Sequence, residues 1–475
     1  MITGAPVNVV DYGASTSDSF GVVNRDAFQA ALDSGASYVY VPSGTYNIAG
    51  TISIPNANVT LSGPDGGTQA YQCATINHLS TSTGPLFLVD SIANGGVCLR
   101  NFNVTGGNGS FCISSSRPYV RYEYIHMEPY NGGGIQLLSS GGGSSSSKII
   151  NCQWVAPRVS TNYTGFEISV NGGDVHLVGC TAIFGAIGVE IKQGQTIILD
   201  KCSLNKQVMD VITGGYSSAT QFNTCAIKLS GSGYKNAISI KNCYIEAFTN
   251  GIYVESCQSL SITDNYITDG GVPGFCGIGN SIINLVDSNA KNITIQNNRF
   301  EYLANGTITD NYYGIYFNSA VNVIFANNYT TLAGSYAAQY KLTTSNSVTK
   351  LNNILIITSS TPMSSVDADH NINSLDLRNG FNNYSQLSGT IGNSWVDVVD
   401  APNRSMWKVY MGDYITAGGV HTEATVQVDN SGTSVITYQI QTGAVHGEVQ
   451  VSGGKIQVQS ASATLACMYS VQRVI

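Results

Sequence analysis

Two acidic residues, Glu167 and Glu190, occupy the same position in two copies of a short repeated motif. A pair of carboxylates is the minimum equipment for glycoside hydrolysis, because one must protonate the leaving oxygen while the other activates water or attacks the sugar. Two like charges held close together raise the pKa of one of them, which helps to create the acid. Whether these two side chains meet depends on the repeat that positions them.

The repeat is clearest in three segments that begin at Gly188, Gly251 and Gly314 and align without a gap. Each contains short runs in which apolar and polar residues alternate, the pattern of a β-strand. We expect two such strands per unit, joined by a polar link and followed by a variable loop. Further copies with short insertions run over 134–152, 165–180, 226–243 and 282–298.

A repeat of roughly 30 residues with short strands and no helical period predicts a parallel β-solenoid. One column of each unit holds either Asn or Cys, for example Cys202, Asn265 and Asn328. We expect this column to point inward at a turn, where Asn bonds to the backbone of the next rung and Cys acts as a small buried apolar residue.

The third residue of the first strand points outward in every unit, because its two neighbours are apolar. Adjacent rungs lie about 4.8 Å apart, so Glu167 and Glu190 should be neighbours on one exposed face. We predict this pair as the catalytic acid and the base or nucleophile. A solvated, locally compensated charge ladder is the alternative interpretation. The residues predicted to line a sugar-binding groove in the same column are Gln136, Lys228, Tyr253, Asn284 and Tyr316.

Other acids compete for the catalytic role. Glu246 and Glu301 share a second column with Thr268 between them, which places them about two rungs, roughly 9–10 Å, apart. Asp210 lies in the longest loop between rungs, and loops carry function on solenoids. Acids facing each other across two subunits are a further alternative. Asp269 and Asp310 lie in other loops.

Two histidines could act as general bases, although exposed histidines without a catalytic role are the more ordinary interpretation. His126 and Glu128 flank Met127 before a glycine-rich loop, where we expect an exposed turn. His176 falls at an outward position of a second strand.

Charge and composition limit the remaining classes of function. The chain has 475 residues, a net charge of −8 and only 11% charged residues, so a basic surface for nucleic acid is not expected. No stretch of about 18 apolar residues predicts a membrane span. The 11 cysteines include no Cys-x-x-Cys pair, so we expect no metal and no cofactor. They favour folding in a reducing cytoplasm.

The N-terminal residues differ from the repeat. A helix is predicted over Asn24–Asp33, capped by Asn24, between Asp11-Tyr12-Gly13-Ala14 and Val41-Pro42-x-Gly44-x-Tyr46. This arrangement resembles the N-terminal signature of the pectin-lyase-like right-handed parallel β-helix proteins, and among them most closely the bacteriophage tailspikes. The resemblance covers about residues 7–335.

The resemblance implies a homotrimer in the virion tail, folded in the host cytoplasm and attached to phage tail or baseplate proteins. It also implies an enzyme that acts outside the cell on a bacterial surface polysaccharide (a capsule, an exopolysaccharide or an O-antigen). With the paired carboxylates, the expected activity is that of an endo-acting glycoside hydrolase. The alternatives are a polysaccharide lyase acting by β-elimination and a receptor-binding spike without catalysis. An acidic uronate chain would be repelled by a groove that holds two glutamates.

Three regions follow from these patterns. Residues 1–80 are expected to form the N-terminal cap and the first turns, and residues 81–342 a parallel β-helix with the polysaccharide groove. Residues 343–475 alternate strongly between glycine turns and predict an antiparallel β-sandwich for trimerisation or carbohydrate binding.

Overall fold

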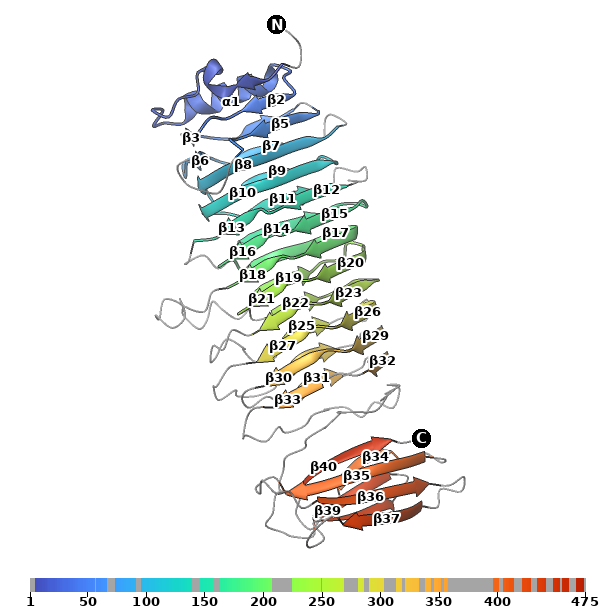
Figure 1. Cartoon of the computed structure of the whole chain (residues 1–475). Helices are drawn as coiled ribbons and strands as arrows, with labels where there is room; N and C mark the ends of the chain where they lie inside the picture. Colours follow the sequence, from blue (N-terminus) through green and yellow to red (C-terminus); the bar gives the residue numbers. More distant parts are fainter. Residues whose placement is uncertain are drawn as a thin grey trace.

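The structure is a computed structural model (Figure 1). It describes residues 5–55, 57–65, 73–90, 95–138, 146–157, 163–206, 224–248, 250–268, 281–285, 290–302, 313–317, 321–332, 338–342, 346–351, 354–357, 396–400, 405–413, 421–428, 434–440, 447–452, 455–460 and 467–473.

The described part of residues 7–357 is a right-handed parallel β-helix in which each regular turn supplies three strands. In one turn these are β22 (Asn250–Val254), β23 (Leu260–Thr263) and β24 (Tyr266–Thr268). Each pairs in parallel with its equivalent in the next turn. The expectation of two strands per unit was wrong, because the strand after the Asn or Cys column is too short to show alternation of its own.

Three stacks of strands result, which we call the first, second and third stack. The first contains β4 (Ile52–Ile54), β7 (Phe87–Val89), β9 (Ile113–Ser115), β11 (Ile135–Leu138), β14 (Thr164–Ser169), the first half of β17 (Ile187–Asp200), β19 (Cys225–Leu229), β22, β25 (Ser281–Leu285), β28 (Tyr313–Phe317) and β31 (Ala338–Leu342).

The second stack contains β1 (Val7–Asn8), β2 (Tyr38–Tyr40), β5 (Val59–Ser62), the first halves of β8 (Val97–Gly106) and β10 (Val120–Tyr130), β12 (Ser147–Ile150), β15 (Val175–Val178), the second half of β17, β20 (Lys235–Lys241), β23, β26 (Lys291–Gln296), β29 (Val321–Ala326) and β32 (Asn346–Leu351). The third contains β3 (Gly44–Ile48), β6 (Ala74–His78), the second halves of β8 and β10, β13 (Gln153–Val155), β16 (Thr181–Ile183), β18 (Ser203–Asn205), β21 (Tyr244–Glu246), β24, β27 (Arg299–Tyr302), β30 (Tyr329–Leu332) and β33 (Ile354–Ile357).

The repeat glycines lie in file at the start of the first stack, as the sequence predicts. The registers of β17, β19, β22, β25 and β28 place Gly188, Gly251 and Gly314 in one column. Glycine is found in this column because the backbone of the next rung leaves no room for a side chain. A Cβ at Gly134 would lie 2.3 Å from the carbonyl oxygen of Gly165, closer than any side chain can approach.

The interior of the β-helix is filled by the inward residues of all three stacks. In the turn β22–β24, Ile252, Val254, Ile262 and Ile267 are almost completely buried. Burial of one such side chain contributes ~1.5–3 kcal/mol. The repeated alternation therefore produces one continuous apolar core along the stacked turns.

An asparagine ladder occupies the inward turn between the second and third stacks, as predicted. The backbone N–H of Asn265 donates to Oδ1 of Asn298 at 3.0 Å, and Nδ2 of Asn298 donates to Oδ1 of Asn328 at 3.0 Å. All three side chains are buried. Each amide thus satisfies the backbone of its own or a neighbouring rung where strand pairing is interrupted.

The same column holds Cys152, Cys180, Cys202 and Cys243, and all four are buried free thiols. Burial raises the pKa of Cys152 to about 12. A thiol that stays protonated is unreactive, which confirms the packing role expected for this column.

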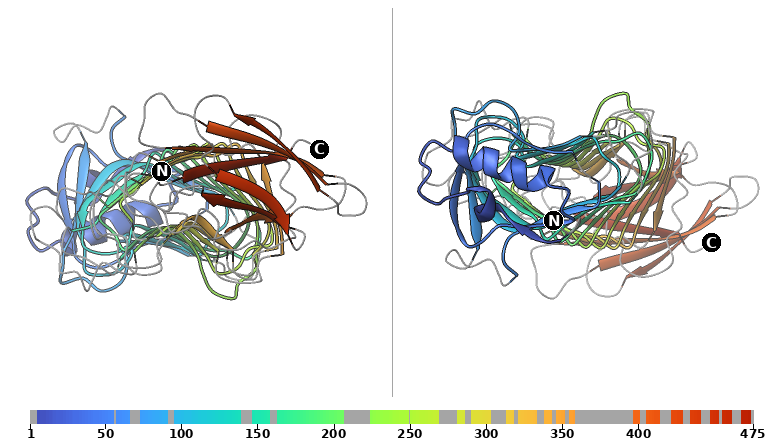
Figure 2. Two further views of the ribbon diagram at one scale, coloured as in Figure 1. Left: turned by 90° about the horizontal axis from the view of Figure 1, so that it is seen from below. Right: turned by 90° about the horizontal axis from the view of Figure 1, so that it is seen from above.

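The end of the core is covered by α1 (Val22–Asp33), which lies over the first turns next to the short 3₁₀ helix η1 (Val9–Tyr12) (Figure 2). The helix buries Phe28 and Leu32 against these turns. The prediction of Asn24 as its cap was wrong. The helix begins earlier, and a carboxylate oxygen of Asp18 accepts the Asn24 backbone N–H at 2.9 Å. The Asn24 amide is buried and binds the backbone of Ser15 and Asn47.

The C-terminal strands form two antiparallel sheets, as expected for a sandwich. One contains β34 (Val396–Asp400), β38 (Gly447–Ser452) and β39 (Lys455–Ser460). The other contains β35 (Ser405–Asp413), β36 (His421–Val428), β37 (Ser434–Ile440) and β40 (Cys467–Arg473). The expected boundary at residue 342 was too early, because β32 and β33 still pair with β29 and β30. Within the described residues, no helix is long and apolar enough to cross a membrane.

Candidate active site

The predicted outward column exists in the first stack. Gln136 pairs with Glu167, Glu167 with Glu190, and Glu190 with Lys228. The column continues through Tyr253 to Asn284 and Tyr316. For these last two only the backbone position is described. The strand order therefore confirms the stacking on which the carboxylate pair depends.

The two glutamates are not on an exposed surface, contrary to expectation. Glu167 is 7% exposed and Glu190 is 8% exposed. Neighbouring polar side chains cover them: Nε2 of Gln136 donates to Oε1 of Glu167 at 2.9 Å, and Oγ of Ser230 donates to Oε1 of Glu190 at 2.7 Å. The carboxylates are thus held in fixed positions.

Lys192 joins the two carboxylates, and the sequence-based search missed it. Its Nζ lies 2.7 Å from Oε2 of Glu167 and 3.6 Å from Oε2 of Glu190. Lys192 follows Glu190 by two residues on β17, so the strand alternation could have placed it on the same surface. Burial by itself lowers the pKa of this lysine, but the hydrogen bond to Glu167 and the two negative charges outweigh burial and hold the pKa above its usual value. Lys192 is therefore a cation.

The shared lysine limits the separation of the two acids. Oε2 of Glu167 and Oε2 of Glu190 can be no farther apart than the sum of 2.7 and 3.6 Å, about 6.3 Å. Carboxyl groups ~5–5.5 Å apart are typical of retaining glycosidases, and ~6.5–9.5 Å of inverting ones. The separation is therefore compatible with a retaining mechanism and short for an inverting one.

The next residues of the column add a charge and an aromatic ring. Lys228 is 29% exposed in its side chain, with its Nζ 4.0 Å from Oε1 of Glu190. Tyr253 follows on the next rung and is half-buried. Burial and the nearby charge of Glu255 raise the pKa of the Tyr253 phenol, so it stays a neutral hydrogen-bonding group.

The rival acids Glu246 and Glu301 lie two rungs apart on the third stack with Thr268 between them, as predicted. Both are engaged. Glu246 accepts from Tyr244 Oη at 2.8 Å and Asn205 Nδ2 at 2.6 Å.

Glu301 is bound by Tyr266 Oη and Arg299. The rings of Tyr244 and Tyr266 stack with centroids 5.4 Å apart, and the Arg299 guanidinium lies over Tyr266 and Tyr329. The aromatic faces of Tyr244 and Tyr266 are therefore turned toward each other along the third stack. Asp210, Asp269 and Asp310 lie outside the described residues.

The two histidines have different surroundings. His126 lies within β10 and is half-buried, so the expectation of an exposed turn was wrong. Burial lowers its pKa, although the nearby Glu128 opposes this shift. Glu128 accepts from Gln153 Nε2 at 2.8 Å. His176 pairs with Lys148 and Ile198 at an outward position of β15, as predicted.

Among the residues that the structure describes, no three His, Cys, Asp or Glu side chains are grouped so that they could hold a metal ion.

Comparisons with known proteins give similarity in structure only. No protein-family model matches the chain, and no curated protein is similar to it in sequence. The solved structures with a similar fold include three examples. The tailspike protein of Acinetobacter phage vB_ApiP_P1 is 13% identical with a TM-score of 0.45, over 100% of this chain and 88% of that one. ORF18 of Geobacillus virus E2 is 14% identical with a TM-score of 0.49, over 97% and 85%. The A-module of the Azotobacter vinelandii mannuronan C-5 epimerase AlgE6 is 14% identical with a TM-score of 0.44, over 77% and 97%.

Proposed function

We propose that this chain binds a bacterial surface polysaccharide as a tailspike-type protein and cleaves it by endo-acting hydrolysis with Glu167 and Glu190. One observation carries the catalytic part of the proposal. Two carboxylates on adjacent rungs of one column share the ammonium group of Lys192 and lie within about 6.3 Å of each other. This upper limit admits the ~5–5.5 Å separation of the two carboxyl groups in retaining glycosidases.

The hydrogen bonds suggest which carboxylate takes which role. Glu167 accepts from Gln136 and forms the shorter contact with Lys192, so we assign it as the ionised nucleophile. Glu190 lies farther from its two cations, 3.6 Å from Lys192 and 4.0 Å from Lys228, and accepts from a neutral hydroxyl, so we assign it as the general acid. In this assignment Glu190 gives its proton to the leaving glycosidic oxygen while Glu167 attacks the anomeric carbon. Water then releases the sugar with the configuration retained.

Lys192 must leave the space between the carboxylates when a sugar enters. Its side chain is 43% exposed, so it has a path toward solvent. Its departure would leave the two carboxylates facing the sugar without their shared cation. Lys228 would stay 4.0 Å from Glu190. Since Lys192 is protonated, it is not available as the base of a β-elimination.

A receptor-binding spike without turnover is the second candidate, and one specific observation favours it. Three of the four carboxylate oxygens lie within 2.9 Å of a protein donor, and the fourth, Oε2 of Glu190, lies 3.6 Å from Nζ of Lys192. The two glutamate side chains are at most 10% exposed. A ladder of this kind also stabilises the wall of a β-helix.

The resemblance of the N-terminal residues to tailspikes supports the rest of the proposal. The chain would act as a homotrimer in the virion tail, joined to tail or baseplate proteins, and the C-terminal sandwich would contribute to trimerisation or carbohydrate binding. Light scattering of the purified chain measures the number of subunits, and a monomer would contradict this part.

The decisive experiment measures new reducing ends on a panel of capsules, exopolysaccharides and O-antigens. Glu167→Gln and Glu190→Gln should each lower the rate by ~10²–10⁴-fold, the usual contribution of such groups. Glu246→Gln is the matched control and should keep the wild-type rate. The first product should keep its anomeric configuration by NMR. Wild-type rates in both variants would refute the assignment, an unsaturated product with ultraviolet absorbance would identify a lyase, and binding without product would identify the spike.

A further inference from the structure

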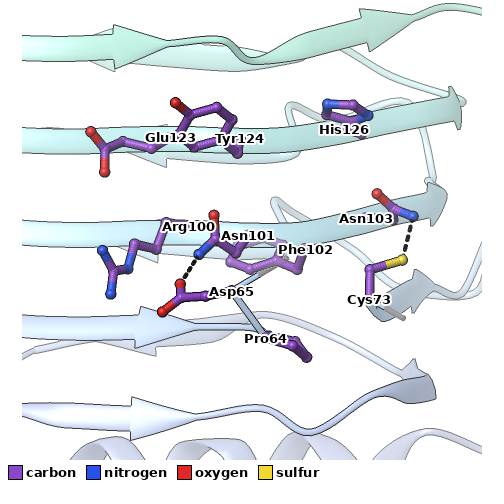
Figure 3. A pocket seen from close by; sticks show the side chains of 10 residues that line it. All are labelled: Pro64, Asp65, Cys73, Arg100, Asn101, Phe102, Asn103, Glu123, Tyr124 and His126. Carbon is purple, nitrogen blue, oxygen red and sulfur yellow. Dashed lines mark hydrogen bonds between the residues drawn. The ribbon is translucent and has the colours of Figure 1, made fainter. Parts of the chain in front are cut away.

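A pocket of about 400 Å³ opens where the second and third stacks meet on β8 and β10 (Figure 3). It shares no residue with the column that holds Glu167 and Glu190, which belongs to the first stack. Its walls come from three levels of the chain: the segment after β5 contributes Asp65, β8 contributes Arg100, and β10 contributes Glu123. This volume falls within the ~300–1,000 Å³ of small-molecule sites.

Charged groups of both signs line this pocket. Arg100 and Glu123 occupy paired positions on neighbouring strands, and Nε of Arg100 donates to Oγ of Ser62 at 3.3 Å. The Glu123 side chain is 9% exposed, and its Oε1 is bound by Nε of Arg121. Within the described part of the chain, no hydrogen bond reaches its second oxygen. The site therefore holds a nearly buried carboxylate with an acceptor still available.

Further polar groups surround this pair (Figure 3). Asp65 is exposed and accepts from Nδ2 of Asn101 at 2.6 Å. Asn103 and His126 pair across β8 and β10 on the other side of the pocket. Because burial lowers the pKa of His126, its ring is neutral at pH 7 and can both donate and accept a hydrogen bond.

Tyr124 supplies an aromatic ring at the same place. It is 48% exposed and makes no ring contact with another described aromatic side chain. Its backbone φ of 53° is that of a recurring left-handed turn, which Asn101 and Asn151 adopt at the same place in the neighbouring rungs. Tyr244 and Tyr266 differ, since their rings stack on each other. Tyr124 therefore has a ring face available for a ligand.

We propose that this pocket binds one neutral sugar residue, as a second carbohydrate site independent of Glu167 and Glu190. A neutral pyranose presents hydroxyl groups around its edge and C–H groups on its face. Asp65 and Glu123 would accept from the hydroxyls, Arg100 would donate to a sugar oxygen, and Tyr124 would pack against the C–H face. An acidic sugar would meet two carboxylates and fits less well.

Saturation-transfer NMR on the full chain tests this with glucose, galactose, mannose and N-acetylglucosamine at millimolar concentration, and glucuronate as the acidic comparison. At least one neutral sugar should bind the wild type. Tyr124→Gly should abolish the transfer. Asp65→Asn, at an exposed site where folding is not at risk, should weaken binding by ~10-fold or more, because hydrogen bonds to charged groups are the stronger ones.

The chain offers a matched control. Tyr119 is 51% exposed and has a φ of 58°, so Tyr119→Gly repeats the chemical and backbone change of Tyr124→Gly outside the pocket. It should keep wild-type binding. Glu190→Gln should also keep it, which separates this site from the proposed hydrolase. Absence of binding by every neutral sugar, unchanged binding in Tyr124→Gly, or stronger binding of glucuronate would each overturn the proposal.

Discussion

The asparagine ladder allows a quantitative test of how the β-helix is held together. Asn298 is the middle member: its Oδ1 accepts the backbone N–H of Asn265 at 3.0 Å and the Nδ2 of Asn265 at 2.9 Å. Its own Nδ2 donates to the carbonyl of Ile262 at 2.9 Å and to Asn328 at 3.0 Å. All of these groups are buried, so Asn298→Ala would leave them without this partner and without water.

The magnitude follows from these contacts. The backbone N–H of Asn265 loses its acceptor, at a cost of ~1–3 kcal/mol for an unsatisfied buried donor. The other lost hydrogen bonds add ~1 kcal/mol each, although Asn265 keeps a bond to the Ile240 carbonyl through its Nδ2. We therefore expect Asn298→Ala to lower the free energy of unfolding by ~3–5 kcal/mol.

Asn298→Cys is the matched control, because the chain itself uses cysteine in this column at Cys202 and Cys243. A thiol fills more of the space and donates to carbonyls, as Cys243 does to the Lys241 carbonyl at 3.2 Å. It is a weak acceptor for the Asn265 N–H. The expected loss for this variant is intermediate, ~1–2 kcal/mol.

Guanidinium unfolding followed by circular dichroism measures these differences. If refolding is incomplete, the unfolding rate replaces the equilibrium value and should rise by up to ~10³-fold in Asn298→Ala. A loss below ~1 kcal/mol in Asn298→Ala, or equal losses in the Ala and Cys variants, would refute the idea that amide hydrogen bonds stabilise this column.

Three further predictions follow from other buried groups. Burial lowers the pKa of His78 to about 4, so the stability that the neutral imidazole contributes is complete above about pH 6.5 and decreases by ~3 kcal/mol as the pH falls toward 4. His78→Gln should reduce this pH dependence in unfolding measurements over that range. Identical pH profiles for the variant and the wild type would contradict the prediction. Lys192→Met should destabilise the fold by ~2–3 kcal/mol in urea unfolding, because the two adjacent carboxylates lose their shared cation. Adding Glu167→Gln to this variant should recover part of the lost stability. If it recovers none, repulsion between the two carboxylates is not the cause of the loss. Cys152 should not react with a thiol reagent until the chain unfolds, since burial raises its pKa to about 12, and mass spectrometry of labelled peptides would detect early modification.

The architecture and the order of the outward column could be predicted from the sequence alone. Strand alternation decides which side chains point inward, and the repeat decides which residues follow one another from rung to rung. These two facts were sufficient to place Glu167 beside Glu190 and Asn298 beside Asn328. Strand alternation and the order of the rungs both follow from the backbone, and the residue pattern that encodes them recurs in every repeat.

What only the tertiary structure decided is how the side chains of neighbouring rungs meet. Lys192 could bind either glutamate or point into solvent, and its position between both depends on packing around Gln136 and Ser230. The role of Asp18 at α1 and the pocket beside Tyr124 likewise join segments that differ from the repeat. Insertions and side-chain conformations have no period, so no pattern in the sequence records the contacts that they make.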